Sequence, residues 1–327
     1  MEISLVNTGF FGWCMDMLRG LEAARTPFMD KLMSALTVLG EEMAFIALGL
    51  VIFWCVSKRF GYRFIFIYLL GAVVNQVLKA LFMIPRPWVI DGRLSIVESA
   101  REGASGFSFP SGHTQSAVLM YGGIASAFKG RAGRILACVA ALIVAIVGFS
   151  RMYLGVHTLL DVGVSLITGV IILALLMRKN SRFGERPGAY LAAAAGVCAA
   201  AAGLIVLINA VCVPADLEPY YNAAEKAEMI GGSLKDAWTL LGSALGLLLG
   251  YFVETKFVDF DPKAVWWAQI IKVVVGLAVI LGLRIGLKAV LGMISNSPAM
   301  NCVRYFILTF VGVAVLPILF KLFPKKA

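Results

Sequence analysis

Long apolar runs, separated by short polar segments, follow one another along almost the whole chain. We interpret nine of these runs as helices that cross a membrane, several of them somewhat shorter than the ~20 residues needed to span a bilayer. The runs lie near residues 38–56, 64–83, 112–128, 135–150, 158–177, 190–212, 237–253, 265–288 and 303–320. The pattern therefore predicts an all-α fold, a polytopic transmembrane helical bundle of about nine spans.

The first 27 residues carry a mixed pattern that is typical of a helix lying in the membrane interface. Apolar and charged side chains recur at helical spacing, which gives residues 1–27 one apolar and one polar side. The apolar side consists of Phe10, Phe11, Trp13, Met17 and Leu21, and the polar side of Asp16, Arg19 and Glu22. The charges also make the segment too polar for the core of a cleavable signal peptide, so we expect the first span to act as the insertion signal.

Composition supports membrane embedding and argues against nucleic-acid binding. Hydrophobic residues make up 60% of the 327-residue chain, and its mean hydropathy is +0.88. Soluble proteins are nearer roughly half apolar. The net charge is +10, but the basic residues form short clusters between apolar runs, with no basic patch interleaved with aromatic residues. Such clusters are typical of cytoplasmic loops, so no nucleic-acid partner is expected.

The distribution of Lys and Arg predicts which loops face the cytoplasm. Basic clusters occupy alternate loops and the C-terminal tail, and cytoplasmic loops of membrane proteins are enriched in these residues. The clusters are Lys58, Arg59 and Arg63; Lys129, Arg131 and Arg134; Arg178, Lys179, Arg182 and Arg186; and Lys321, Lys325 and Lys326. The segments 84–111, 150–157 and 213–235 then face outward, as in a multi-pass protein of a cytoplasmic (inner) membrane.

A shift in composition after residue 187 divides the chain. Residues 188–204 are rich in alanine and glycine, and nothing beyond them resembles a catalytic pattern. The role of this later region is open: an oligomer interface, a lid or a second lipid site. We therefore expect an amphipathic interfacial helix over 1–27, a helical core over 28–187 and an appended transmembrane helical region over 188–327.

Glycine and cysteine spacing adds two details. Gly242, Gly246 and Gly250 lie four positions apart, which permits close helix–helix packing. The six cysteines show no CxxC pair and no metal-ligand spacing. A disulfide is left open between Cys212 and Cys302, which both fall on the expected outward side.

Side chains suited to phosphate chemistry occur in three stretches, of which the first runs from Lys79 to Arg86-Pro87. Lys79 and Arg86 are seven residues apart, so they share one helix face two turns apart. Pro85 and Pro87 end the helix. A lysine within a span is costly, and an anion held by both side chains would offset that cost. The alternative is a lysine that snorkels to the interface.

The second stretch is Phe109-Pro110-Ser111-Gly112-His113, which opens an apolar helix. Ser111 can cap that helix, and Gly112 lets a ligand approach the backbone. Free N–H groups in a first helical turn bind phosphate, and His113 would then lie beside the anion. A plain N-cap followed by a surface histidine is the alternative.

The third stretch runs from Ser150-Arg151 to His157 and Asp161. Arg151 ends one span and His157 begins the next, with Asp161 one helical turn further along the same face. A carboxylate at that position can hold an imidazole in one tautomer and stabilise its cation. The alternative is a structural His–Asp pair that anchors two helices.

Together the three stretches predict a phosphate site. On the predicted topology they bring a lysine, two arginines, a helix N-terminus, an aspartate and the only two histidines of the chain to one membrane face. Phosphoryl transfer depends mainly on positioning and on stabilising charge on the phosphoryl oxygens. These side chains meet that need without a metal ion, so neither a metal nor a cofactor is expected.

The pattern also resembles a known family. Lys-x6-Arg-Pro, Pro-Ser-Gly-His and Ser-Arg-x5-His-x3-Asp, in this order, are similar to the three-part signature of the type 2 phosphatidic acid phosphatases. That superfamily includes lipid phosphate phosphatases, bacterial undecaprenyl-diphosphate phosphatases, glucose-6-phosphatase and vanadium haloperoxidases. The resemblance covers about residues 28–178 and implies a type 2 phosphatidic acid phosphatase-like helical core.

The resemblance implies a role for each residue of the site. His157 would be the nucleophile and form a phosphohistidine, with Asp161 orienting it and His113 transferring protons. The implied phosphate-binding residues are Lys79, Arg86, Ser111, Gly112 and Arg151. This chemistry requires His113 to be charged while His157 is neutral, so their environments are expected to separate their pKa values.

These expectations describe an integral membrane phosphatase, a phosphoric ester hydrolase acting on lipid phosphate or diphosphate monoesters at the outer membrane face. Undecaprenyl diphosphate, phosphatidylglycerol phosphate and phosphatidic acid are candidate substrates, membrane lipids are the expected surroundings, and a homo-oligomer is left open. Two alternatives stay open. One is a lipid phosphotransferase that uses the same site, and the other is a lipid-phosphate transporter, suggested by Lys272, Arg284 and Lys288 within one apolar run.

Overall fold

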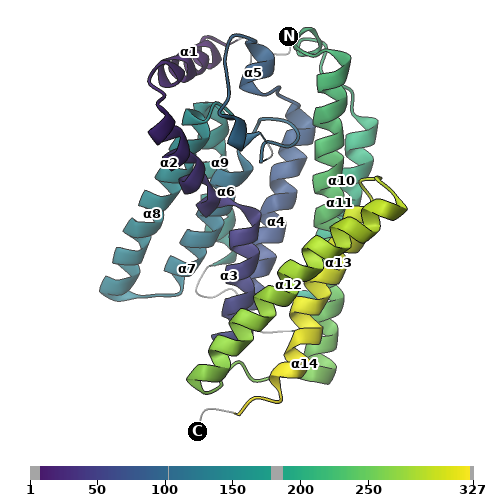
Figure 1. Ribbon diagram of the computed structural model, residues 1–327. Helices are drawn as coiled ribbons and strands as arrows, with labels where there is room; N and C mark the ends of the chain where they lie inside the picture. Colours follow the sequence, from purple (N-terminus) through teal and green to yellow (C-terminus); the bar gives the residue numbers. More distant parts are fainter. Residues whose placement is uncertain (1–7, 102, 178–186, 325–327) are drawn as a thin grey trace. The chain divides into compact units, whose positions relative to one another are not determined.

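The computed structural model describes residues 8–101, 103–177 and 187–324, in which all regular secondary structure is helical (Figure 1). The longer helices are α1 (Gly9–Ala23), α2 (Pro27–Thr37), α3 (Glu42–Cys55), α4 (Lys58–Phe82), α8 (Gly130–Tyr153), α9 (Leu159–Leu176), α10 (Pro187–Ala210), α11 (Ala223–Val253), α12 (Trp266–Ile294) and α13 (Met300–Phe310). The shorter ones are α5 (Pro87–Ile90), α6 (Gly112–Ala117), α7 (Gly123–Ser126) and α14 (Leu316–Phe320). Three π-helical turns cover Val118–Gly122, Glu254–Val258 and Val311–Val315. Residues 1–7, the expected cytoplasmic cluster at 178–186 and the tail residues Lys325 and Lys326 lie outside the described residues.

Helix length and composition confirm a polytopic membrane protein. Among the described residues, seven helical stretches are long and apolar enough to cross a membrane, and the pair α2 and α3, bent by 43°, would make eight. The seven are α4 with α5, α8, α9, α10, α11 with the turn after it, α12, and α13 with α14. The sequence predicts about nine spans. The run expected at 112–128 is not among them, because its helix ends at Ser126 and is too short to cross alone.

α1 forms where the sequence predicts an amphipathic helix. Thr8 caps it, because its hydroxyl accepts a hydrogen bond from the Phe11 amide at 3.2 Å. Phe10 and Trp13 stack on each other and stay exposed, which suits a helix that touches lipid. The buried side consists of Phe11, Cys14, Met15 and Leu18. Its location at the membrane interface stays a prediction.

The described helices belong to two compact units that are interleaved in sequence. The first unit comprises residues 1–44, 74–179 and 206–233, and the second comprises 45–73, 180–205 and 234–327. Both α4 and α11 therefore contribute to each unit. The sequence predicts three consecutive segments instead, and the division into a phosphatase core and an appended region stays a prediction.

Small residues bring the helices of the first unit close together. α6 packs against both α8 and α9. A Cβ atom on Gly148 of α8 would lie 2.9 Å from Val162 of α9, and one on Gly169 of α9 would lie 2.8 Å from Val118. Contacts this short leave no room for a side chain in a close-packed interior. The packing fixes the N-terminal ends of α6 and α9, where most of the predicted site residues lie.

The second unit contains the glycine spacing noted in the sequence. α13 packs on the α11 face that carries Gly242, Gly246 and Gly250. A Cβ atom on Gly246 would lie 2.7 Å from the Phe306 carbonyl oxygen, and one on Gly250 would lie 3.0 Å from Val313. These three glycines, which we call the glycine stripe of α11, thus permit the close helix–helix packing that their spacing predicts. All six cysteines of the chain, Cys212 and Cys302 included, are free thiols in the structure.

Candidate active site

All eight predicted site residues belong to the first unit, and they come from five helix ends. Helix ends concentrate such residues because their backbone N–H and C=O groups are not used within the helix. Lys79 lies in the last turn of α4 and Arg86 directly before α5, while Arg151 lies in the last turn of α8. The remaining five lie at the N-terminal ends of α6 and α9: Ser111, Gly112, His113, His157 and Asp161.

The three cations are almost completely buried, with exposed fractions of 4% for Lys79 and 1% each for Arg86 and Arg151. Removing a charge from water costs several kcal/mol unless hydrogen bonds compensate. Here the compensation comes largely from one loop, residues 103–107, which we call the carbonyl loop. Four of its carbonyl groups accept hydrogen bonds from these side chains.

The hydrogen bonds to the carbonyl loop are short for the first two cations. Lys79 Nζ donates to the Phe107 carbonyl at 2.7 Å. Arg86 donates from Nε to the carbonyl of Gly106 at 3.0 Å and from Nη2 to that of Ser105 at 2.6 Å. Arg151 makes a longer contact, 3.5 Å, from Nη2 to the Gly103 carbonyl, and a 3.0 Å bond from Nη1 to Thr37 Oγ1. The loop therefore sets where the three charges lie.

His157 is fixed in one tautomer by its neighbours. Its Nε2 lies 3.1 Å from Arg86 Nη1. A guanidinium can only donate hydrogen bonds, so Nε2 must accept, and the proton of the neutral ring is on Nδ1. Nδ1 lies 3.4 Å from Asp161 Oδ2, which places the carboxylate beside this nitrogen without a well-aligned hydrogen bond. The lone pair available for chemistry is therefore on Nε2.

Burial and charge hold His157 neutral. The residue lies between α8 and α9, outside the candidate spans, and is 2% exposed. Burial, followed by the positive charges of Arg86, Arg151 and Lys79, lowers its pKa well below the ordinary value of 6.5. A neutral imidazole is the form that can attack an electrophile.

His113 is less buried than His157, and its pKa is shifted the same way. Burial, then the charges of Arg151 and Arg86, lower its pKa well below 6.5. The ring lies near the carbonyl loop, since a Cβ atom added to Gly103 would lie 3.7 Å from His113 Nε2. The pKa values of both histidines are thus lowered, whereas the sequence leads us to expect a charged His113 beside a neutral His157 when substrate is bound.

Asp161 is held by two groups in addition to facing His157. Its Oδ2 accepts hydrogen bonds from the Thr158 amide and from Ser108 Oγ, both at 2.7 Å. Thr158 and Asp161 also form a capping box, because the Thr158 hydroxyl accepts from the Asp161 amide at 3.2 Å. The two hydrogen bonds to Oδ2 hold the carboxylate beside Nδ1 of His157.

Ser108 and Ser165 also belong to the site, although the sequence does not predict them. Ser165 Oγ bonds to the carbonyl groups of Ser111 at 2.8 Å and of Asp161 at 2.7 Å, and so joins α9 to the start of α6. A Thr-x-x-Asp pattern at 158–161 could have predicted the capping box. No local pattern marks their place at the site, since the contacts of Ser108 with Asp161 and of Ser165 with Ser111 join residues 53 and 54 positions apart in the chain.

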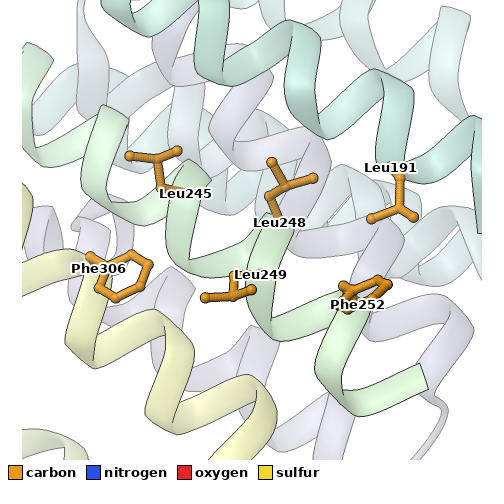
Figure 2. A pocket seen from close by; sticks show the side chains of 6 residues that line it. All are labelled: Leu191, Leu245, Leu248, Leu249, Phe252 and Phe306. Carbon is orange, nitrogen blue, oxygen red and sulfur yellow. The ribbon is translucent and has the colours of Figure 1, made fainter. Parts of the chain in front are cut away.

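The structure also contains an apolar groove in the second unit, with a volume of about 370 Å³. It is lined by Leu191 of α10, by Leu245, Leu248, Leu249 and Phe252 of α11, and by Phe306 of α13 (Figure 2). None of these six side chains can bind a phosphate or transfer a proton. The groove is therefore not a site for this chemistry.

Two family models match the chain. The model described as PAP2 superfamily matches residues 60–185, and the model described as PAP2 superfamily phosphatase, transmembrane extension, matches residues 238–326. Together they cover about two thirds of the chain, and the first contains all eight predicted site residues.

Curated relatives are also phosphatases. Phosphatidylglycerophosphatase B of Bacillus subtilis (strain 168) is 29% identical over 171 residues, which are 50% of this chain and 82% of that protein. Lipid phosphate phosphatase delta of Arabidopsis thaliana is 24% identical over 185 residues, which are 52% of this chain and 43% of that protein. The match thus spans less than half of the plant protein.

Two solved structures resemble part of the fold. The crystal structure of a transmembrane PAP2 type phosphatidylglycerolphosphate phosphatase from Bacillus subtilis has a TM-score of 0.44 and 23% identity, covering 52% of this chain and 86% of that one. The crystal structure of Aquifex aeolicus LpxE has a TM-score of 0.45 and 24% identity, covering 54% of this chain and 99% of that one.

A helical membrane fold that matches phosphatase family models defines the class: an integral membrane phosphatase, which hydrolyses phosphoric esters. The chain belongs to the PAP2 superfamily, as its three-part signature leads us to expect. The roles of the individual site residues stay predictions.

Proposed function

We propose that this phosphatase hydrolyses lipid phosphate or diphosphate monoesters on the outer face of the cytoplasmic membrane, through a phosphohistidine at His157 and without a metal ion. The observation that carries the proposal is the fixed tautomer of His157. Arg86 lies at Nε2, at 3.1 Å, and Asp161 lies behind Nδ1, at 3.4 Å. The ring therefore presents a lone pair next to a cation that would bind the phosphoryl group.

In the first step, the lone pair on Nε2 of His157 attacks phosphorus and the bond from phosphorus to the ester oxygen breaks. His113 gives its proton to the leaving oxygen, and the Asp161 carboxylate stabilises the charged imidazole ring. In the second step, His113 takes a proton from water, the water oxygen attacks phosphorus, and the bond from phosphorus to nitrogen breaks. Inorganic phosphate leaves and His157 is neutral again.

The phosphate would be bound by Lys79, Arg86 and Arg151, together with Ser111 and Gly112 at the start of α6. Three positive charges suit a phosphoryl group whose negative charge is spread over its equatorial oxygens. A bound dianion would also counter the cations that lower the pKa of His113, and so allow that ring to carry a proton. The substrate itself would then separate the pKa values of the two histidines.

The spans around the site support a lipid substrate. The bacterial relative is named for phosphatidylglycerophosphate and the plant relative for lipid phosphates. Phosphatidylglycerol phosphate, phosphatidic acid and undecaprenyl diphosphate all place a phosphate at the membrane surface while their chains stay in the bilayer. We propose this group as the substrate class.

A transport function has less support from the residues that suggested it. Lys272 is buried and donates to the Pro262 carbonyl at 3.2 Å, whereas Arg284 is half-buried and Lys288 is exposed. These three side chains do not share one environment, as a polar pathway would require.

Phosphate release from purified protein tests the proposal. The full chain in liposomes is assayed against a panel of lipid phosphates and diphosphates, with and without EDTA, and beside His157→Ala and His113→Ala. We expect phosphate release from at least one lipid, unaffected by EDTA and almost abolished in both folded variants. Full activity of His157→Ala would sink the proposal, and a phosphorylated lipid product in place of free phosphate would indicate phosphotransfer.

A further inference from the structure

The carbonyl loop is pressed against α11, outside the region that carries the phosphatase signature. Gly106 has a φ of +62°, and a Cβ atom on it would lie 2.7 Å from Ser233 Oγ. A Cβ atom on Gly232 would lie 2.6 Å from the Gly106 amide nitrogen. The backbones of the loop and the helix therefore touch directly, and both belong to the first unit.

The loop residue that meets α11 also accepts a hydrogen bond from one of the cations proposed to bind phosphate. Arg86 Nε donates to the carbonyl of Gly106, the same residue that meets α11. The neighbouring carbonyl groups of Ser105 and Phe107 accept from Arg86 and Lys79 at 2.6 and 2.7 Å. A displacement of Gly106 would consequently move the tips of both side chains.

We propose that Gly232 and Ser233 of α11 are positioning residues, which set the place of the carbonyl loop and thereby of Lys79 and Arg86. The inference rests on the proposed function of these two cations as phosphate-binding residues. It gives part of the 188–327 region, whose role the sequence left open, a function in phosphate binding. The first 11 residues of α11, 223–233, belong to the same compact unit as the site.

The expected size of the effect follows from the geometry. A methyl group on Gly232 meets a backbone atom of the loop, which cannot rotate away as a side-chain tip can. A misplacement of ~1 Å in a positioning group can lower catalysis ~100-fold. Because the hydrogen bonds from Arg86 and Lys79 to the loop are only 2.6 and 2.7 Å long, a shift of the loop carbonyl groups would move both side chains.

The test compares Gly232→Ala with its neighbour Gly231→Ala, in the full chain and with the lipid phosphate that is hydrolysed fastest. A Cβ atom on Gly231 meets nothing within 4 Å, so this variant controls for the change in helix propensity. The measurements are kcat, KM and the inhibition constant of inorganic phosphate. For Gly232→Ala we expect kcat/KM to fall about ten- to a hundredfold, with a matching rise in the phosphate inhibition constant.

A purely structural contact gives a different result. It would lower the amount of active protein, and hence the apparent kcat, while KM and the phosphate inhibition constant stay unchanged. That result, or equal behaviour of the two glycine variants, overturns the inference but leaves the proposed function intact. Activity retained in His157→Ala would instead overturn the proposed function.

A milder variant covers the case in which Gly232→Ala does not fold. Ser233→Cys replaces the oxygen beside Gly106 with a larger sulfur atom, and so should displace the carbonyl loop by less than Gly232→Ala does. A severalfold rise in the phosphate inhibition constant supports the inference, and an unchanged constant in folded Ser233→Cys overturns it.

Discussion

At the scale of single residues, the proposed chemistry depends on which nitrogen of His157 is free. The hydrogen bond from Arg86 at Nε2 keeps that nitrogen unprotonated, and Asp161 faces the other. For attack on phosphorus, the guanidinium must turn from Nε2 to a phosphoryl oxygen. Arg86 would therefore bind the substrate and release the nucleophile in the same movement.

The lowered pKa of His157 predicts how activity depends on pH. A pKa below 6.5 means that the ring is neutral at pH 7 and becomes protonated only as the pH falls further. Protonation removes the attacking lone pair, so kcat/KM falls only where His157 becomes protonated. We therefore expect no decline of kcat/KM as the pH is lowered from about 7.5 to about 6.5, and a decline only at lower pH. Initial rates on a short-chain substrate, at constant ionic strength, measure this profile. An acid limb of the pH profile with an apparent pKa above 6.5 would contradict the lowered pKa of His157.

Ser108 offers a second test at this scale. Ser108→Ala removes one of the two 2.7 Å hydrogen bonds to Asp161 Oδ2. A hydrogen bond to a charged group is worth about 1.5–3 kcal/mol, so kcat should fall about ten- to a hundredfold. KM should change little, because Ser108 contacts the carboxylate and is not among the proposed phosphate-binding residues. Ser126→Ala is the control, since that hydroxyl bonds within its own helix, to the Gly123 carbonyl, and lies away from the site. A normal kcat in Ser108→Ala would mean that Thr158 suffices to hold Asp161.

At the scale of elements, the sequence predicts the helix ends and caps that depend on neighbouring residues. Pro85 and Pro87 predict the end of a helix, and α4 ends at Phe82. Ser111 was expected to cap a helix, and its hydroxyl accepts from the Thr114 amide. The carbonyl loop was not foreseen, because its contacts join Lys79 and Arg86 to irregular backbone 19 to 28 residues away. Neither periodicity nor capping patterns describe such a loop.

The glycine stripe of α11 gives a prediction for the second unit. Gly246→Leu would place side-chain atoms against the Phe306 carbonyl and Thr309, whose distances to a Cβ atom are 2.7 and 2.9 Å. Overpacking of this kind costs about 1–3 kcal/mol or more, so the thermal unfolding temperature should fall clearly. Gly282→Leu in α12 adds the same apolar group where nothing lies within 4 Å, and should have little effect. Equal unfolding temperatures for the two variants would refute the close packing of α11 and α13.

At the scale of the whole molecule, composition predicted the membrane-embedded helical fold but could not predict its compact units. α4 and α11 each contribute to both units, and residues 206–233 group with the site although they follow the composition shift at 187. One contact that brings them there is the hydrogen bond from the Tyr221 hydroxyl to the Met83 carbonyl, at 2.8 Å. Contacts over such distances in the chain leave no trace in local composition.

Orientation in the membrane can be tested with a native cysteine. Cys212 is exposed and lies in the segment after α10. Val213 and Leu217 of this segment belong to the same buried hydrophobic cluster as Phe107 and Phe109 beside the site. If the site faces outward, a membrane-impermeant maleimide should modify the protein in intact cells, and Cys212→Ser should remove that labelling. Labelling that appears only after the membrane is opened would place this loop, and the site with it, on the cytoplasmic side.

The most direct test of the central claim is to trap the phosphoryl group on the enzyme. Purified protein is mixed with a lipid carrying radiolabelled phosphate, quenched within one turnover, and digested to locate the label. The account predicts an acid-labile, base-stable label on the peptide that contains His157, present in the unmodified protein and absent in a folded His157→Ala variant. Turnover with no labelled enzyme at any quench time, or a label that persists in His157→Ala, would contradict it.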